Sequence, residues 1–251
     1  MNSRKAQWMA VAAAVSAATV AGAQTETGGL EEVTVTAQRR EQSLQDVPIA
    51  ITAFTAEQLA RRNIVDTYDL VRNIPNLTGN NNVGVGTSSS YYIRGIGNGE
   101  SIATFDVPVG TYVDDVYIAR QNQNNFSMFD VERIEVLRGP QGTLFGRNTT
   151  GGAINIVMKK PSAEHRGYVE AGIGRFGLYS ARASTDLPIS DKILTKLSVY
   201  KVKDDGYAYQ ISTGNKLNDR DATGLRGEVR LLPTDSLTVD LIAEWIADRN
   251  T

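Results

Sequence analysis

VERIEVLRGPQGTLFGRNTTGGAINIVM, residues 131–158, is the most specific stretch of this sequence. Its apolar and β-branched ends predict two short strands, at 134–137 and 153–158. The connection between them is rich in glycine, a residue that readily adopts a positive φ or allows a close backbone approach. The stretch therefore predicts a compact strand–turn–strand unit.

The same glycines could be mistaken for a phosphate-binding loop. Residues 139–146, Gly-Pro-Gln-Gly-Thr-Leu-Phe-Gly, lack the Lys-Ser/Thr ending of a P-loop. They also lack the glycine spacing of a dinucleotide-binding fingerprint. We therefore do not expect nucleotide binding.

From residue 47 to about residue 161 the pattern is α/β, with short helices and strands separated by polar loops. Thr55 and Gln58 have the spacing of a capping box and predict the start of a helix. Asp66 is expected to cap a second helix, which ends before Pro75. Further strands are expected at 91–94, 109–113 and 116–119.

After Pro161 the apolar residues recur with a period of two. In residues 225–231, apolar residues and glycine alternate with charged residues, and residues 237–245 repeat the alternation. Each strand has about ten residues, which is the length of an outer-membrane barrel strand. Strands are expected at 166–174, 178–188, 192–203, 223–232 and 237–248.

The connections between these strands are of two kinds. Turns at 190–191 and 233–236 are tight, whereas residues 204–222 form a long polar loop. Short turns on one side and long loops on the other are typical of a transmembrane barrel, although the short connection at 174–177 departs from this rule. A soluble antiparallel sheet with one buried face gives the same alternation, so the periodicity alone leaves both interpretations open.

The N-terminus has the pattern of a secretory signal peptide. Two basic residues precede an apolar stretch at 8–20, and Ala21 and Ala23 supply the small residues that a signal peptidase accepts. The stretch is shorter than the ~20 strongly apolar residues of a membrane span. We predict removal of residues 1–23, with cleavage before Gln24. N-terminal sequencing of the exported protein checks this, and a chain that still begins with the initiator methionine would contradict it.

Residues 24–44 carry little apolar surface to offset the entropy lost on ordering, so we expect a flexible tail. Within it, residues 33–37 are Val-Thr-Val-Thr-Ala, an island of β-branched residues. Such an island is suited to pairing with the edge of another protein's sheet.

Charge and composition exclude several classes of function. The formal net charge of -2 offers no case for nucleic acid. The chain has no Cys and a single His, so thiol catalysis and the usual zinc sites lack their ligands, and no metal or cofactor is expected. The adjacent carboxylates Asp114 and Asp115 are better explained as a hairpin turn than as an acid–base pair. We predict no catalytic residue and no enzyme activity.

Taken together, these segments resemble the TonB-dependent receptor family. The most specific motifs are Glu-Arg-Ile-Glu-Val-Leu-Arg-Gly-Pro at 132–140, Leu-Phe-Gly at 144–146 and Gly-Gly-Ala-Ile-Asn at 151–155. Asp-Val-Pro-Ile-Ala at 46–50 is similar to the opening of the family's plug domain, and Tyr-Ile-Arg-Gly at 92–95 is similar to its central strand. Residues 32–37, which we name the box segment, look like a TonB box.

The resemblance implies an α+β plug domain at 45–161. It implies that residues 162–251 are the first antiparallel strands, about five, of an incomplete transmembrane β-barrel. Family barrels have about 22 strands, so we expect an N-terminal fragment that does not transport by itself. The expected location is the outer membrane of a Gram-negative bacterium, in contact with its lipid, after export to the periplasm.

The resemblance also implies a function, which is active uptake of a scarce small-molecule ligand. A ferric siderophore or a similar iron complex is the expected ligand. The expected partner is TonB, with the inner-membrane complex that uses the proton-motive force. The alternative is an exported periplasmic plug-like module that binds or interacts without a pore.

Expected site residues follow from the same resemblance. The box segment, Glu32, Val33, Thr34, Val35, Thr36 and Ala37, is expected to contact TonB. Arg94 and Arg138 match arginines that lie between plug and barrel in the family. Apical loops are expected to contact the ligand through Asn80, Asn81, Asn82, Gly97, Asn98 and Gly99, for which flexible polar turns are the alternative interpretation.

Overall fold

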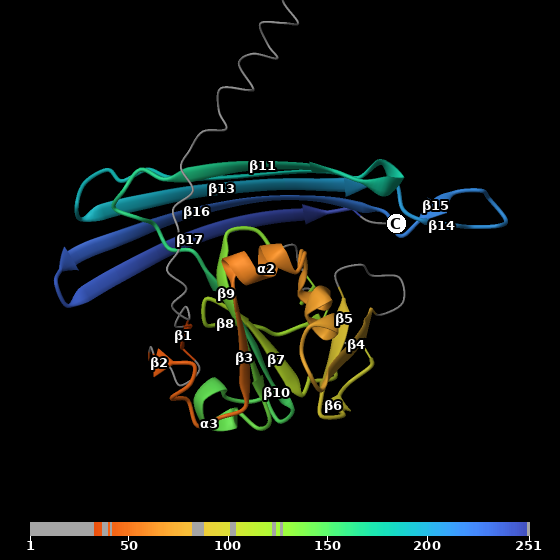
Figure 1. Cartoon of the computed structure of the whole chain (residues 1–251), viewed down its shortest axis with the longest axis horizontal. Coiled ribbons are helices and arrows are strands. Elements are labelled where there is room, and N and C mark those ends of the chain that lie inside the picture. The colour runs from red at the N-terminus through yellow and green to blue at the C-terminus, as the bar shows by residue number, and fades with distance from the viewer. Residues whose placement is uncertain are drawn as a thin grey trace, which may run out of the picture. The chain divides into compact units, whose positions relative to one another are not determined.

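A computed structural model describes residues 33–36, 40, 42–81, 88–100, 104–121, 124–125 and 128–249. The expected signal peptide, most of the expected tail, and Glu32, Ala37 and Asn82 lie outside these described residues. The described residues form an α+β domain and a five-stranded antiparallel sheet (Figure 1).

The α+β domain is built on a five-stranded sheet with the order β3-β9-β10-β7-β8. The stretch 131–158 forms its centre. Its two strands, β9 and β10, pair antiparallel, and Gly152 lies opposite Arg138. β10 then pairs in parallel with β7. The strands are β3 (Ile51–Thr55), β7 (Val109–Val113), β8 (Val116–Ile118), β9 (Val131–Arg138) and β10 (Gly152–Met158).

A smaller three-stranded sheet lies beside it, in the order β4-β5-β6. Its strands are β4 (Leu77–Asn81), β5 (Ser89–Ile93) and β6 (Ile96–Gly97). Leu77 and Ile93 from this sheet share one buried apolar core with Ile134 and Ile154 from the larger sheet. The two sheets therefore form a single α+β domain.

Both predicted helix starts are confirmed. Thr55 forms a capping box with Gln58 at the start of α2 (Ala56–Arg61). Asp66 forms a capping box with Asp69 at the start of η1 (Thr67–Arg72), which is a 3-10 helix. A further short helix that was not predicted, α3 (Gly142–Phe145), lies inside the glycine-rich connection.

Asp66 gives a prediction about stability. Burial, together with the neighbouring Asp69 carboxylate, raises the pKa of Asp66 above its ordinary value. The folded state therefore binds this proton more tightly than the unfolded chain does, and the parent protein gains stability as the pH falls through the raised pKa.

We expect Asp66→Asn, which keeps a capping oxygen, to be at least as stable as the parent at pH 7. Asp66→Ala should lose about 1 kcal/mol. Urea unfolding across pH checks both, and a larger loss in Asp66→Asn than in Asp66→Ala would contradict the prediction.

The C-terminal sheet has the order β11-β12-β13-β16-β17, and each of its strands lies within a few residues of its predicted position. The expected long loop contains a small hairpin, β14–β15, and the short connection at 174–177 contains η3 (Arg175–Gly177). The elements are β11 (Gly167–Ile173), β12 (Tyr179–Asp186), β13 (Ile193–Asp204), β14 (Ala208–Tyr209), β15 (Lys216–Leu217), β16 (Arg220–Thr234) and β17 (Leu237–Asp248).

The two faces of this sheet differ in polarity. One face exposes apolar side chains in register across neighbouring strands, such as Val199, Leu225 and Trp245. The opposite face buries charged side chains, such as Lys196 and Arg226, against the α+β domain. None of the helices in the described ranges combines the length and hydropathy needed to cross a membrane.

Candidate functional site

The described part of the box segment is docked on the α+β domain, which corrects the expected flexible tail for these residues. Strand β1 (Thr34–Val35) pairs antiparallel with β2 (Gln42–Ser43). The Val35 side chain is 0% exposed and packs in an apolar cluster with Leu137 and Phe145. The flexible tail was expected because residues 24–44 contain few apolar residues of their own. In the structure, the apolar side chains of the box segment pack against those of the α+β domain, and this burial stabilises the docked strand.

A buried carboxylate holds the next residue of the box segment. Glu135, in the centre of β9, is 0% exposed. Its Oε1 atom accepts hydrogen bonds from the Thr36 backbone N–H at 2.8 Å and from the Thr36 hydroxyl at 3.2 Å. Arg133 Nε donates to the same oxygen at 2.9 Å, and Asn155 Nδ2 donates to Oε2 at 3.4 Å. Glu135 is therefore satisfied by the box segment and by its own sheet together.

The expected apical ligand residues are structured. Asn80 and Asn81 lie within β4 rather than in a loop, paired with Ser90 and Ser89. Asn81 Oδ1 also accepts the Ser89 hydroxyl at 2.7 Å. Both residues belong to β4, which runs to Asn81.

The second expected ligand group lies on the other side of β5. Gly97 is in β6, opposite Tyr92. The Asn98 carbonyl accepts from Gln121 Nε2 at 2.9 Å, and its side chain accepts the Glu100 N–H at 3.0 Å. β4 and β6 flank β5 from opposite sides, so the described members of the two groups do not meet in one pocket.

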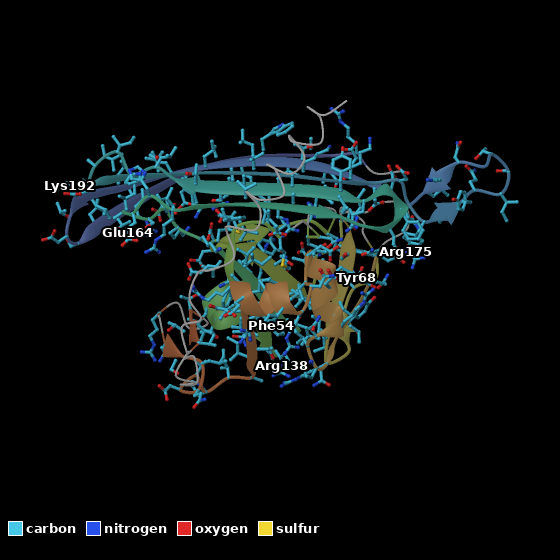
Figure 2. All side chains as sticks on the ribbon, turned by 45° about the horizontal axis from the view of Figure 1, so that its top comes forward. Phe54, Tyr68, Arg138, Glu164, Arg175 and Lys192 are labelled. Atoms are coloured by element: carbon cyan, nitrogen blue, oxygen red, sulfur yellow. The ribbon has the colours of Figure 1, made fainter. Side chains whose placement is uncertain are left out.

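The Arg94 guanidinium lies beside the residue after Arg138, and Arg138 does not lie against the C-terminal sheet (Figure 2). The guanidinium of Arg94 lies beside Gly139: a Cβ atom at position 139 would be 3.3 Å from Arg94 Nη1. Figure 2 shows Arg138 at the end of the α+β domain far from the C-terminal sheet. Within the described part of the chain, neither arginine pairs with a carboxylate of that sheet. The buried Arg138 Nε has no hydrogen-bond partner there.

Other charged residues join the domain to the sheet. Asp130, immediately before β9, accepts the Ser198 hydroxyl at 2.6 Å and the Ser184 hydroxyl at 3.2 Å. Lys196 Nζ lies 3.3 Å from Asp130 Oδ2 and 3.6 Å from Asp186 Oδ1. Beside this cluster, the rings of Phe129 and Tyr200 pack with their centroids 4.4 Å apart.

A second ionic cluster starts from the β7–β8 hairpin. Asp114 and Asp115 form its turn with positive φ, as the sequence predicted. Asp114 also accepts from Arg226 of β16 and lies 3.2 Å from Lys160 Nζ. Arg226 further contacts Glu244 at 2.8 Å and Glu228 at 3.4 Å. These buried charges were not predicted as a site, although the alternation of charged residues in 225–231 indicated a polar inner face.

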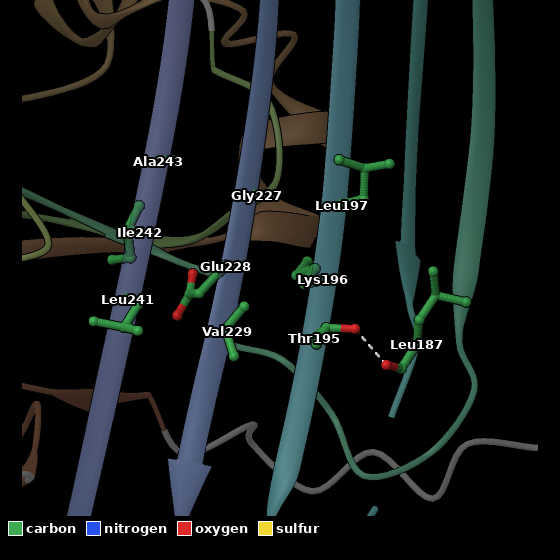
Figure 3. A pocket seen from close by; sticks show the side chains of 10 residues that line it. All are labelled: Leu187, Thr195, Lys196, Leu197, Gly227, Glu228, Val229, Leu241, Ile242 and Ala243. Carbon is green, nitrogen blue, oxygen red and sulfur yellow. Dashed lines mark hydrogen bonds between the residues drawn. The ribbon is translucent and has the colours of Figure 1, made fainter. Parts of the chain in front are cut away.

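A hollow of 410 Å³ lies within the C-terminal sheet rather than in the α+β domain (Figure 3). It forms because Gly227 has no side chain between its cross-strand neighbours Leu197 and Ala243. Its lining is mainly apolar and contains none of the residues expected to bind ligand. The described residues also contain no group of three or more His, Asp or Glu placed to hold a metal ion.

Comparisons with known proteins agree with this architecture. Residues 43–153 match the family model described as the TonB-dependent Receptor Plug Domain. The pesticin receptor of Yersinia pestis is 30% identical over 223 residues, which cover 86% of this chain and 32% of the receptor. The vitamin B12 transporter BtuB of Vibrio cholerae serotype O1 is 26% identical over 207 residues, covering 80% of this chain and 32% of BtuB.

Among solved structures, the ferric yersiniabactin uptake receptor FyuA of Yersinia pestis superposes with a TM-score of 0.74 at 29% identity. The match covers 81% of this chain and 32% of FyuA. The chain thus spans about a third of the length of these relatives.

Proposed function

Because this chain belongs to the TonB-dependent receptor family of the outer membrane, we propose that it is the plug-bearing part of a receptor that actively takes up a ferric siderophore. TonB would supply the energy by pairing with the box segment. The observation that carries the proposal is the combination of a plug domain, a docked β-branched strand at 34–35 and an adjoining sheet with one apolar face.

The ionic clusters support a plug that stays attached to the barrel wall. Asp130 and Asp114, both on the plug, pair with Lys196 and Arg226 on the C-terminal sheet. Both pairs are buried, where loss of one partner is strongly unfavourable. The box segment docks elsewhere, against Glu135 of β9, so its release does not require these pairs to break.

Arg94 and Arg138 support the same assignment from the opposite side of the plug. The Arg94 guanidinium lies beside Gly139, and the buried Nε atom of Arg138 has no hydrogen-bond partner among the described residues, so a carboxylate partner would stabilise it. We propose that they pair with other strands of the barrel wall.

The ligand class rests on the relatives. FyuA is described as a ferric yersiniabactin uptake receptor, whereas BtuB is described as a vitamin B12 transporter. The relative with the higher identity favours an iron complex. The residues proposed to contact it remain the polar groups at 80–82 and 97–99.

The proposal is tested by uptake into cells that carry the whole receptor of which we propose this chain to be a part. Iron loaded on yersiniabactin and labelled vitamin B12 are supplied in parallel, with and without functional TonB. We expect TonB-dependent accumulation of iron and none of vitamin B12. Accumulation of vitamin B12 alone would overturn the ligand class, and uptake that persists without TonB would overturn the energy coupling.

A further inference from the structure

The box strand has one occupied edge and one edge that faces the plug. In an antiparallel pair, the N–H and C=O groups of successive residues point to opposite edges of the strand. The Val33 carbonyl accepts from the Leu44 N–H at 2.9 Å, so the groups of Val33 and Val35 point toward β2. The groups of Thr34 and Thr36 consequently point to the opposite edge.

Glu135 covers that opposite edge. The Thr36 N–H, which an incoming strand would need, donates to Glu135 Oε1 at 2.8 Å. Arg133 strengthens the contact from two sides, because its Nε donates to Glu135 and its Nη2 donates to the Thr36 hydroxyl at 3.2 Å. A carboxylate and an arginine side chain thus take the place of a neighbouring strand.

The side chains add a second obstacle. Val35 points into the apolar cluster that contains Leu137, two residues after Glu135 on the same strand. A partner strand that approached the edge formed by Thr34 and Thr36 would meet β9 before it met the box segment. Docking on the plug and pairing with a partner strand are therefore mutually exclusive.

We propose that Glu135, held by Arg133, is a latch that keeps the box segment docked and closes its free edge to any partner strand. Opening the latch exposes Val35 and frees the Thr36 N–H together. The identity of the partner as TonB rests on the proposed function, whereas the latch itself does not.

The chain contains no Cys, so single cysteines report docking directly. Val35→Cys is buried in the docked state, and the rate of its reaction with a maleimide measures how often the segment leaves the plug. Thr34→Cys is exposed and should react rapidly in every background. Leu70→Cys, in the plug core, reports unfolding of the whole domain.

Glu135→Leu removes both acceptor oxygens and should accelerate labelling of Val35→Cys by about tenfold or more, since hydrogen bonds to charged groups are the stronger ones. Glu132→Gln is the matched control. Glu132 also contacts Arg133 but is exposed and makes no hydrogen bond or ion pair with residues 33–36, the described part of the box segment, so this change should leave the labelling rate unaltered.

A second variant approaches the latch from the segment itself. Thr36→Pro removes the donor N–H and the hydroxyl while leaving Glu135 and the plug core intact. Faster labelling of Leu70→Cys in Glu135→Leu would mean that the plug of this variant has unfolded. In that case Thr36→Pro is the variant that tests the latch. Fast labelling at position 35 with slow labelling at position 70 in Thr36→Pro supports the latch, and slow labelling at both positions overturns it.

The purified C-terminal domain of TonB separates this inference from the proposed function. If both hold, Glu135→Leu binds this domain about tenfold more tightly than the parent, because less of the segment is docked. Faster labelling without any binding of the TonB domain would leave the latch standing and overturn the partner. Equal labelling in Glu135→Leu and Glu132→Gln, with the plug folded, would overturn the latch.

Discussion

Arg226→Met should destabilise the folded protein by roughly 3–5 kcal/mol, the usual loss when one partner of a buried ion pair is removed. The Arg226 side chain is 6% exposed and contacts Asp114, Glu228 and Glu244. After the change, Lys160 is the cation that remains beside Asp114 and Glu228. Equilibrium unfolding in urea, followed by tyrosine and tryptophan fluorescence, measures the loss.

Arg230→Met is the matched control on the same strand. Arg230 pairs with Asp240 at 2.7 Å, but both side chains are about a quarter exposed, so we expect a loss of less than about 1 kcal/mol. Adding Asp114→Asn to Arg226→Met should recover part of the stability, because an uncompensated buried charge is removed. Similar losses from the two arginine changes would show that burial does not set the strength of these pairs.

The regular elements were predictable because each depends on neighbours in sequence. Alternation after Pro161 predicted the five strands of the C-terminal sheet, and the capping residues Thr55 and Asp66 predicted both helix starts. The hairpin turn at Asp114 and Asp115 was also predicted and is confirmed. In each case the residues that form the sequence pattern lie within a few positions of the strand, helix start or turn that the pattern predicts.

Elements that depend on distant partners were missed. β3 is a strand because Ile51–Thr55 pairs with β9, more than seventy residues later in the sequence. Neither this pairing nor the parallel pairing of β10 with β7 leaves a local pattern. The predicted strand at 91–94 was found, but its neighbour β4 was taken for part of a polar loop because its residues include Gly79, Asn80 and Asn81.

The docked box segment was missed for a related reason. Its five β-branched and small residues predicted an added strand, but nothing near them in sequence indicated which surface would receive it. The one available signal was Glu135, a single carboxylate inside the apolar run from Ile134 to Leu137. A charge at such a position needs buried partners, and one of them, beside Arg133 and Asn155, is Thr36, ninety-nine residues away.

In a full-length receptor, Val33→Pro should abolish energised uptake while leaving ligand affinity unchanged. Proline fixes φ at residue 33, and its ring disturbs the extended geometry of the strand with which TonB would pair. The polar groups at 80–82 and 97–99 that we propose for the ligand lie outside the box segment, which is why binding should persist. Binding of the iron complex that we propose as ligand to cells on ice and its accumulation at growth temperature separate the two effects.

Val33→Ile is the matched control for this change. Isoleucine keeps the N–H, the β-branched shape and the apolar contact that Val33 makes with the cluster around Val35. Uptake should therefore remain near the parent level in Val33→Ile and fall to the level of cells without TonB in Val33→Pro. Equal loss of binding and uptake in Val33→Pro would place the defect in the ligand site or in the folding of the plug, because a change confined to the coupling strand cannot lower affinity at a site that it does not touch.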